Sequence, residues 1–272
     1  MKLICQTCMH HCSLESGQTG RCGARTHKNG RILCTNYGRI SSLALDPVEK
    51  KPLRMFNPGS LILSAGSYGC NLRCPFCQNY QISMEYDRMA DISYLSPEQL
   101  ARQAVRYQSA GNIGLAFTYN EPLVGWEYVR DTAKLVKAAG MKTVLVTNGT
   151  ASLEVLEEIL PYTDAMNIDL KGFREDYYRR LGGDLETVKR FIKRAAQVCH
   201  VELTTLIVPG ENDDADCMAE QAAWIGPDIP LHVTRFFPLY HMTDKDATDV
   251  QTVYRLANIA GKYVKHVFVG NC

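Results

Sequence analysis

From residue 61 to the end of the chain, short apolar runs alternate with segments whose apolar residues recur every three or four positions. The runs predict buried strands, and the intervening segments predict amphipathic helices. Alternation of this kind is typical of repeated βα units built on a parallel sheet. We therefore expect an α/β fold in this part of the chain.

The expected strands are LILSAGSY (61–68), IGLAF (113–117), TVLV (143–146), AMNID (165–169), VELTTLIV (201–208), LHVT (231–234) and HVFVG (266–270). Helices are expected between them, including 152–161 and 214–225. One helix has a clear start, because Ser96, Pro97 and Gln99 supply an N-cap, a proline at the first position and a capping-box partner. The units number fewer than the eight of a complete barrel. We expect a partial TIM-type (β/α)6 barrel.

Residues 1–58 differ from the rest, being rich in Cys, Gly, Lys and Arg with little periodicity, and a turn signal, NPGS, follows them. We interpret residues 1–58 as a small cysteine-rich, metal-binding appendage. Residues 59–272 then form the barrel domain.

Composition narrows the functional classes. Hydrophobic residues make up 46% of the chain and charged residues 22%, which is typical of a globular protein. No apolar run approaches the roughly 20 residues that span a bilayer, and the first residues lack the features of a secretory signal. The formal charge is +1 with no basic block. We therefore expect a cytoplasmic protein with neither a membrane nor a nucleic acid as partner.

The eleven cysteines are many for a cytoplasmic protein, where clustered thiols more often bind metal than form disulfides. Seven of them fall in two tight groups, and the other four are interpreted as ordinary core or surface residues: Cys34, Cys199, Cys217 and Cys272.

The second group follows the first barrel strand and contains Cys70, Cys74 and Cys77, separated by three residues and then two. A structural zinc site normally has four protein ligands. Three thiolates without a fourth suit a [4Fe–4S] cluster in which three irons are held and one is open. An open iron can be chelated by the amino and carboxylate groups of a ligand.

This cysteine motif, with the aromatic Phe76 directly before its last cysteine, resembles the radical S-adenosylmethionine (SAM) superfamily. The resemblance implies that the open iron binds SAM. It also places FTYNEP (117–122) where the superfamily commonly has Gly-Gly-Glu and holds the methionine amino group. Glu121 takes the acidic position, while Tyr119 and Asn120 replace the two glycines. The alternative for Glu121 is a carboxylate that favours the start of a helix.

Two further segments, VTNG (146–149) and NIDLK (167–171), resemble those of glycyl radical activating enzymes. The resemblance assigns Thr147 and Asn148 to the SAM site and places Asp169 and Lys171 beside the SAM carboxylate. An ordinary surface ion pair is the alternative for the last two. Val146 stands where those enzymes carry an acidic residue that helps to hold a monovalent cation, so a cation site is expected to be weak or absent.

The segment FFPLYHMTD (236–244) extends the resemblance and assigns His241 to the adenine or ribose of SAM. A structural histidine is the alternative. Over nearly the whole chain, the likeness is to pyruvate formate-lyase activating enzyme-like proteins of the AmmeMemoRadiSam type.

This likeness implies an oxidoreductase that cleaves SAM reductively to a 5′-deoxyadenosyl radical, which abstracts hydrogen from a substrate. The substrate is expected to be a glycine of a glycyl radical enzyme, with another protein or a small molecule as the alternative. The electron donor would be a flavodoxin or a ferredoxin. A different class of function, a non-catalytic iron–sulfur electron carrier, would need no SAM-facing segments.

The first cysteine group contains four thiols, Cys5, Cys8, Cys12 and Cys22. Four ligands with Cys-x-x-Cys pairing favour a structural zinc ion that stabilises an appendage without a core of its own. An additional iron–sulfur cluster is the alternative. His10 and His11 could replace a thiol but are expected to be exposed.

Overall fold

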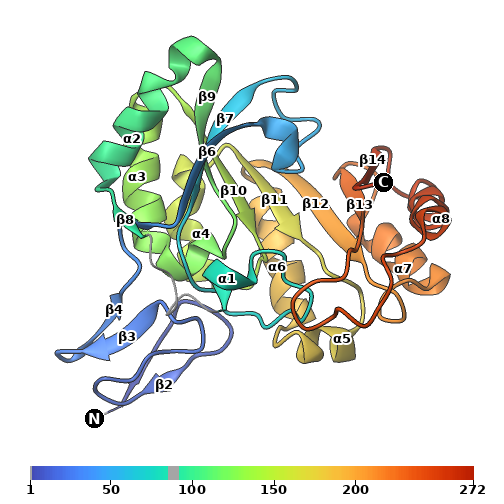
Figure 1. Cartoon of the computed structure of the whole chain (residues 1–272), viewed down its shortest axis with the longest axis horizontal. Helices are drawn as coiled ribbons and strands as arrows, with labels where there is room; N and C mark the ends of the chain where they lie inside the picture. Colours follow the sequence, from blue (N-terminus) through green and yellow to red (C-terminus); the bar gives the residue numbers. More distant parts are fainter. Residues whose placement is uncertain (1, 85–91) are drawn as a thin grey trace.

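The computed structural model describes residues 2–84 and 92–272 and is built around one eight-stranded sheet (Figure 1). The strand order is β14-β13-β12-β11-β10-β9-β7-β6. Every neighbouring pair is parallel except β6 and β7, which are antiparallel. The bounds are β6 Ser42–Pro47, β7 Leu61–Gly66, β9 Asn112–Phe117, β10 Lys142–Thr147, β11 Ala165–Asp169, β12 His200–Ile207, β13 Leu231–Arg235 and β14 Val267–Gly270.

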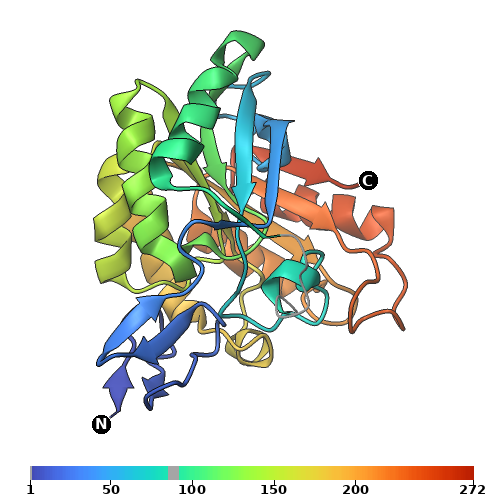
Figure 2. The same ribbon diagram turned by 60° about the vertical axis from the view of Figure 1, so that its left-hand side comes forward.

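Helices connect the parallel strands, so the predicted α/β class and partial barrel are confirmed. The α-helices are α1 Tyr80–Ser83, α2 Pro97–Arg106, α3 Trp126–Ala138, α4 Leu153–Ile159, α5 Glu175–Arg180, α6 Leu185–Ala195, α7 Ala215–Ile225 and α8 Val250–Ala260. Short 3₁₀ helices are η1 Val48–Lys50, η3 Gln108–Ala110, η4 Pro122–Gly125 and η5 Leu160–Tyr162. Helices α2, α3 and α4 lie together on the outside of the sheet in both views (Figures 1 and 2).

Helix α2 begins where the sequence predicts. Ser96 Oγ accepts a hydrogen bond from Gln99 N, and Gln99 Oε1 accepts one from Ser96 N, which completes the capping box. The helix buries Leu100 and Ala104 against the sheet. Strand β10 has fully buried residues on both faces, Val144 and Leu145, as expected for a parallel strand covered on both sides.

Residues 3–34 form two small antiparallel pairs that lie apart from the main sheet, at the lower left of Figure 2: β1 Leu3–Ile4 with β2 Ser13–Leu14, and β3 Arg25–Lys28 with β4 Arg31–Cys34. A third pair, β5 Arg39–Ile40 with β8 Ser93–Tyr94, is also separate from the main sheet. Arg25 on β3 connects the N-terminal pairs to the barrel, because its buried guanidinium donates to Val124 O and to both carboxylate oxygens of Glu127.

Strand β6 belongs to the main sheet although it precedes the predicted domain boundary at residue 58. The division of the chain into an appendage and a barrel domain therefore stays a prediction. Among the residues that the structure describes, no helix is both long enough and apolar enough to cross a membrane.

Candidate active site

The carboxyl ends of the parallel strands and the loop after β7 enclose a cavity of about 560 Å³. Parallel sheets place chemistry at this edge, because the loops that follow neighbouring strands meet there. Eleven of the twelve site residues predicted in the barrel line the cavity: Cys70, Cys74, Phe76, Cys77, Tyr119, Asn120, Glu121, Thr147, Asn148, Asp169 and Lys171. The sequence motifs, up to 101 residues apart, thus meet in one place.

The three thiols of the loop are held in a poorly hydrated environment. Burial raises the pKa of Cys74 to about 11, and it raises the pKa of Cys70 well above its usual value. Burial also raises the pKa of Cys77. Thiolates in such a place need a cation to offset their desolvation, and bound iron supplies one.

The arrangement of the three thiols distinguishes between a single metal ion and a cluster. In the described part of the chain, no group of three or more His, Cys, Asp or Glu side chains is arranged to hold a single metal ion. A single ion brings its thiolates to within about 4 Å of one another, since each metal–sulfur bond is about 2.3 Å long. In a [4Fe–4S] cube each thiolate binds a different iron, so the three sulfur atoms need not approach one another this closely. Three cysteines lining one cavity therefore fit a [4Fe–4S] cluster with one open iron.

Glu121 joins the loops that follow β9 and β10. Its carboxylate is 4% exposed and accepts hydrogen bonds from Thr147 Oγ1 at 2.8 Å, from Asn148 N at 2.7 Å and from Leu123 N at 3.0 Å. Burial raises its pKa to about 7, although these hydrogen bonds act in the opposite direction. Because it accepts from Leu123 N, Glu121 is the N-cap of η4. The alternative interpretation of Glu121, a carboxylate at the start of a helix, is therefore confirmed. Its contact with SAM stays a prediction.

Tyr119 and Asn120, which stand at the positions of the two glycines, form hydrogen bonds that hold the walls of the cavity in place. Tyr119 adopts a left-handed backbone conformation with φ 73°, which glycine would reach without strain. Its hydroxyl donates to Asp46 Oδ2 at 2.9 Å. Asn120 accepts from Ser67 N at 2.9 Å and donates to Gly69 O at 3.0 Å. Asn120 therefore fixes the backbone that leads into the cysteine loop.

Asp169 and Lys171 form an ion pair with 2.8 Å between Oδ2 and Nζ. Burial would lower the pKa of Lys171, but the neighbouring carboxylate outweighs it and the pKa lies well above its usual value. Because both residues line the cavity, the pair is not an ordinary surface pair. It offers one ammonium group to an anion that enters the cavity.

Phe76 and His241 have different surroundings. Phe76 is buried and packs edge to face on Phe236, with 6.5 Å between ring centroids. His241 is exposed and does not line the cavity. Its ring packs on Tyr240, which stacks on Tyr80, and its backbone N donates to Pro75 O. His241 is therefore attached to the backbone of the cysteine loop, and its contact with SAM stays a prediction.

The four N-terminal cysteines surround a second, much smaller cavity of about 10 Å³. Cys5, Cys8 and Cys22 are buried, and burial raises the pKa of Cys22 to about 11. His11 is exposed as expected, but His10 is half-buried because its Nε2 donates to Asn71 O at 2.8 Å.

Sequence reasoning missed Asn71, which directly follows the first cluster cysteine. Its side chain is buried, donates to Thr150 Oγ1 at 2.7 Å and accepts from Asn148 Nδ2 at 2.9 Å. Its side chain also lowers the pKa of the Cys8 thiol, against the larger effect of burial, which raises it. The position beside Cys70 was the available signal, but its partners lie far away in the sequence.

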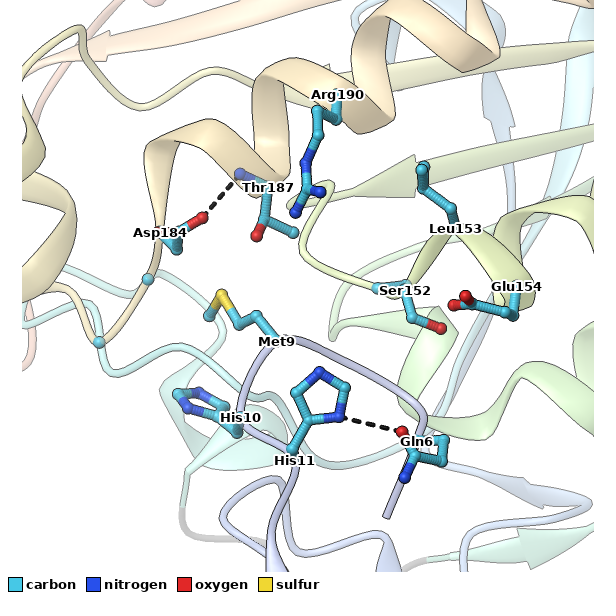
Figure 3. Close-up of a pocket in the computed structure, with 13 residues that line it drawn as sticks. Gln6, Met9, His10, His11, Ser152, Leu153, Glu154, Asp184, Thr187 and Arg190 are labelled. Atoms are coloured by element: carbon cyan, nitrogen blue, oxygen red, sulfur yellow. Dashed lines mark hydrogen bonds between the residues drawn. The ribbon is translucent and has the colours of Figure 1, made fainter. Parts of the chain in front are cut away.

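Another cavity, of about 750 Å³, lies elsewhere, between residues 6–11 and the starts of α4 and α6 (Figure 3). Met9 and Arg190 extend into it from opposite sides, and Asp184 caps α6 at Thr187 N. No cysteine of the 70–77 loop lines it. Its size alone does not make it the reaction site.

Comparison with known proteins identifies similar chains. The family model described as the radical SAM superfamily matches residues 65–220. An uncharacterized protein of Methanocaldococcus jannaschii is 37% identical over 99% of this chain and 81% of its own length. The pyruvate formate-lyase-activating enzyme of Staphylococcus aureus is 26% identical over 71% of this chain and 87% of its own.

The pyruvate formate-lyase 1-activating enzyme of Escherichia coli is 28% identical over 54% of this chain and 61% of its own length. Among solved structures, Streptococcus suis SuiB bound to S-adenosylmethionine superposes with a TM-score of 0.59 at 14% identity, covering 75% of this chain and 48% of that one. At this identity the likeness concerns the fold alone.

Proposed function

This chain belongs to the radical SAM superfamily, and on that premise we propose that it cleaves SAM reductively and removes a hydrogen atom from a substrate. The observation that carries the proposal is one cavity lined by three cysteines and by the Asp169–Lys171 pair. A [4Fe–4S] cluster, when bound, supplies the one-electron reduction of SAM that yields methionine and a 5′-deoxyadenosyl radical.

The chain's own residues bind and orient the reactants. Cys70, Cys74 and Cys77 hold the cluster as thiolates. Lys171 binds the SAM carboxylate through a charge-assisted hydrogen bond, and Asp169 keeps the ammonium group charged and directed. Glu121, with Thr147 and Asn148, fixes the two loops that shape the rest of the SAM site. Holding the reactants in position lowers the activation free energy, because the loss of translational and rotational entropy occurs on binding and not in the reaction step.

For the substrate, the names of the relatives support activation of a glycyl radical enzyme. The partner would then be a protein, with hydrogen taken from a backbone glycine. The electron would come from a flavodoxin or a ferredoxin. Another protein or a small molecule is the alternative within the same chemistry.

For the N-terminal cysteines, we keep zinc as the proposed metal. Cys5, Cys8, Cys12 and Cys22 line one small cavity, and four thiols with Cys-x-x-Cys pairing favour a closed four-ligand zinc site. Among the described residues these four thiols are not arranged around a single ion either, so zinc binding requires them to move closer together. Metal analysis of the purified full chain tests this proposal, with one zinc per chain as the expected result and additional iron and sulfide as the contrary one.

The function is tested by anaerobic reconstitution with iron, sulfide, a reductant and SAM. Methionine and 5′-deoxyadenosine should form, and Cys74→Ala should abolish both products. Cys199→Ala is the matched control, because this half-buried cysteine lies outside the cavity. A full cluster without SAM cleavage in the unmodified protein would show that the chain is a non-catalytic iron–sulfur protein.

A further inference from the structure

The cavity that contains the cysteine loop also reaches into the barrel interior, away from the cysteines. There it is lined by residues of η1 and the segment after it and by inward-facing residues of β12 and β13: Glu49, Lys50, Pro52, Arg54, Thr204, His232 and Thr234. None of these residues belongs to the motifs assigned to the cluster or to SAM. We call this part of the cavity the inner end, and its lining is charged and polar but contains no cysteine.

A buried carboxylate organises the inner end. Glu202 is fully buried and accepts hydrogen bonds from His232 Nε2 at 2.6 Å and from His200 Nε2 at 2.9 Å. It also accepts from the backbone N–H groups of Arg54 and Met55. Four donors thus satisfy the carboxylate, and they fix both the His232 ring and the backbone of Arg54.

His232 itself is well placed for a ligand. Its side chain is about nineteen-twentieths buried and lines the cavity. Glu202 occupies Nε2, so Nδ1 is the ring nitrogen left for another partner. Thr204 and Thr234 line the cavity on the same two strands, and their hydroxyl groups donate to Asn167 Oδ1 and Thr205 O.

Among the described residues, the charges at this end leave one cation unpaired. Lys50 lies 3.5 Å from Asp46, and Glu49 Oε1 is occupied by Gly59 N. Asp46 is shared with the buried Lys51 at 2.9 Å. Arg54 is exposed to solvent, and its guanidinium has no carboxylate partner in the described part of the chain, although its backbone is anchored by Glu202.

We propose that this inner end binds the anionic group of the substrate, a carboxylate or a phosphate, with Arg54 as the main cationic donor. A guanidinium pairs with either group through two parallel N–H···O bonds. The SAM carboxylate has its own cation in Lys171, so the two cations serve different anions. The inference rests on the proposed function and deepens it, since it favours a small acidic molecule over an internal backbone glycine.

The test measures anion binding by calorimetry to the reconstituted protein saturated with SAM, so that the SAM carboxylate site is filled. The probes are acetate, inorganic phosphate and uncharged acetamide. Acetate or phosphate should bind and acetamide should not, and the preferred anion identifies the substrate as an organic acid or a phosphate ester. Arg54→Gln should weaken that binding at least tenfold, and Arg54→Lys should restore part of it.

The matched control is Arg106→Gln, which removes an exposed arginine from α2, outside the cavity. It should bind the anion as the unmodified protein does. Equal binding in Arg54→Gln, equal binding of acetamide, or no anion binding would overturn the inference. Substrate-independent SAM cleavage is measured on the same samples. If cleavage persists while anion binding is absent, only the inference fails, whereas loss of cleavage in the unmodified protein contradicts the proposed function.

Discussion

The side-chain amide of Asn148 donates a hydrogen bond to that of Asn71 across 2.9 Å, which joins the loop after β10 to the cysteine loop. Asn148 also approaches the Cys70 thiol, with 3.7 Å from Nδ2 to Sγ. The Asn71 side chain also acts on Cys8 of the N-terminal group, because it lowers the pKa of that thiol against the larger effect of burial. A short chain of side chains therefore links the two cysteine groups.

We predict that Asn71→Ala destabilises the protein by about 2 kcal/mol, because it removes two buried hydrogen bonds, one to Thr150 Oγ1 and one from Asn148 Nδ2. Urea unfolding of the cluster-free protein measures this change. The double variant with Asn148→Ala should lose less than the sum of the single variants, by about 1 kcal/mol. Asn258→Ala, at an exposed position on α8, is the neutral control. Strictly additive losses would show that the pair is not coupled.

A second prediction concerns acid stability and Glu202. Burial alone would raise the pKa of this carboxyl, but the hydrogen bonds from His200, His232 and two backbone amides outweigh it and lower the pKa to about 2. A folded-state pKa below the unfolded value stabilises the fold above the unfolded pKa of about 4.5. That contribution is lost as the pH falls toward 2.

Between pH 5 and pH 3, this group should therefore reduce the free energy of unfolding by about 2 kcal/mol. Glu202→Gln should be less stable at pH 5 and should lack this part of the pH dependence. Urea unfolding at the two pH values checks both points. A parallel loss in the variant and the unmodified protein would assign the acid sensitivity to other groups.

The core of the candidate site could be predicted because it depends on local patterns. The spacing of Cys70, Cys74 and Cys77 and the position of the other motifs at strand ends are visible in the sequence. A parallel sheet then brings those ends to one edge. This argument needs no knowledge of side-chain packing.

The rest depends on contacts between distant residues. Asn71 meets Cys8 only because of how the N-terminal segment packs on the barrel. Glu202 meets His232 because β12 and β13 pair with Leu203 opposite Leu231, a register that alternating apolar residues do not specify. His241 lies beside the stacked rings of Tyr240 and Tyr80, a contact between distant residues that no motif records.

The third prediction addresses SAM binding. Lys171→Gln should raise the dissociation constant for SAM about tenfold, because a charge-assisted hydrogen bond to a carboxylate contributes about 1.5 kcal/mol. Equilibrium binding to the reconstituted protein measures the change. Lys189→Gln, on α6 and outside the cavity, should leave the affinity unaltered. Unchanged affinity in Lys171→Gln would remove this residue from the SAM site.

The last prediction tests how closely the N-terminal segment packs on the cysteine loop. Gly69 has φ 90°, and a Cβ atom there would lie 2.5 Å from the carbonyl oxygen of Cys22. Gly17 has a similar φ of 85°, but a Cβ atom there would meet nothing within 4 Å. The two positions therefore share the left-handed strain of about 1 kcal/mol and differ in the contact.

Gly17→Ala should accordingly cost only the strain, while Gly69→Ala should cost at least about 2 kcal/mol more, because backbone must move to relieve the overlap. Urea unfolding compares the two variants. Since the displaced backbone carries Cys22 on one side and leads into Cys70 on the other, Gly69→Ala should also reduce the metal retained by the N-terminal cysteines and the iron bound after reconstitution. Equal stability and equal metal content in the two variants would show that the N-terminal segment moves independently of the loop that holds the cluster.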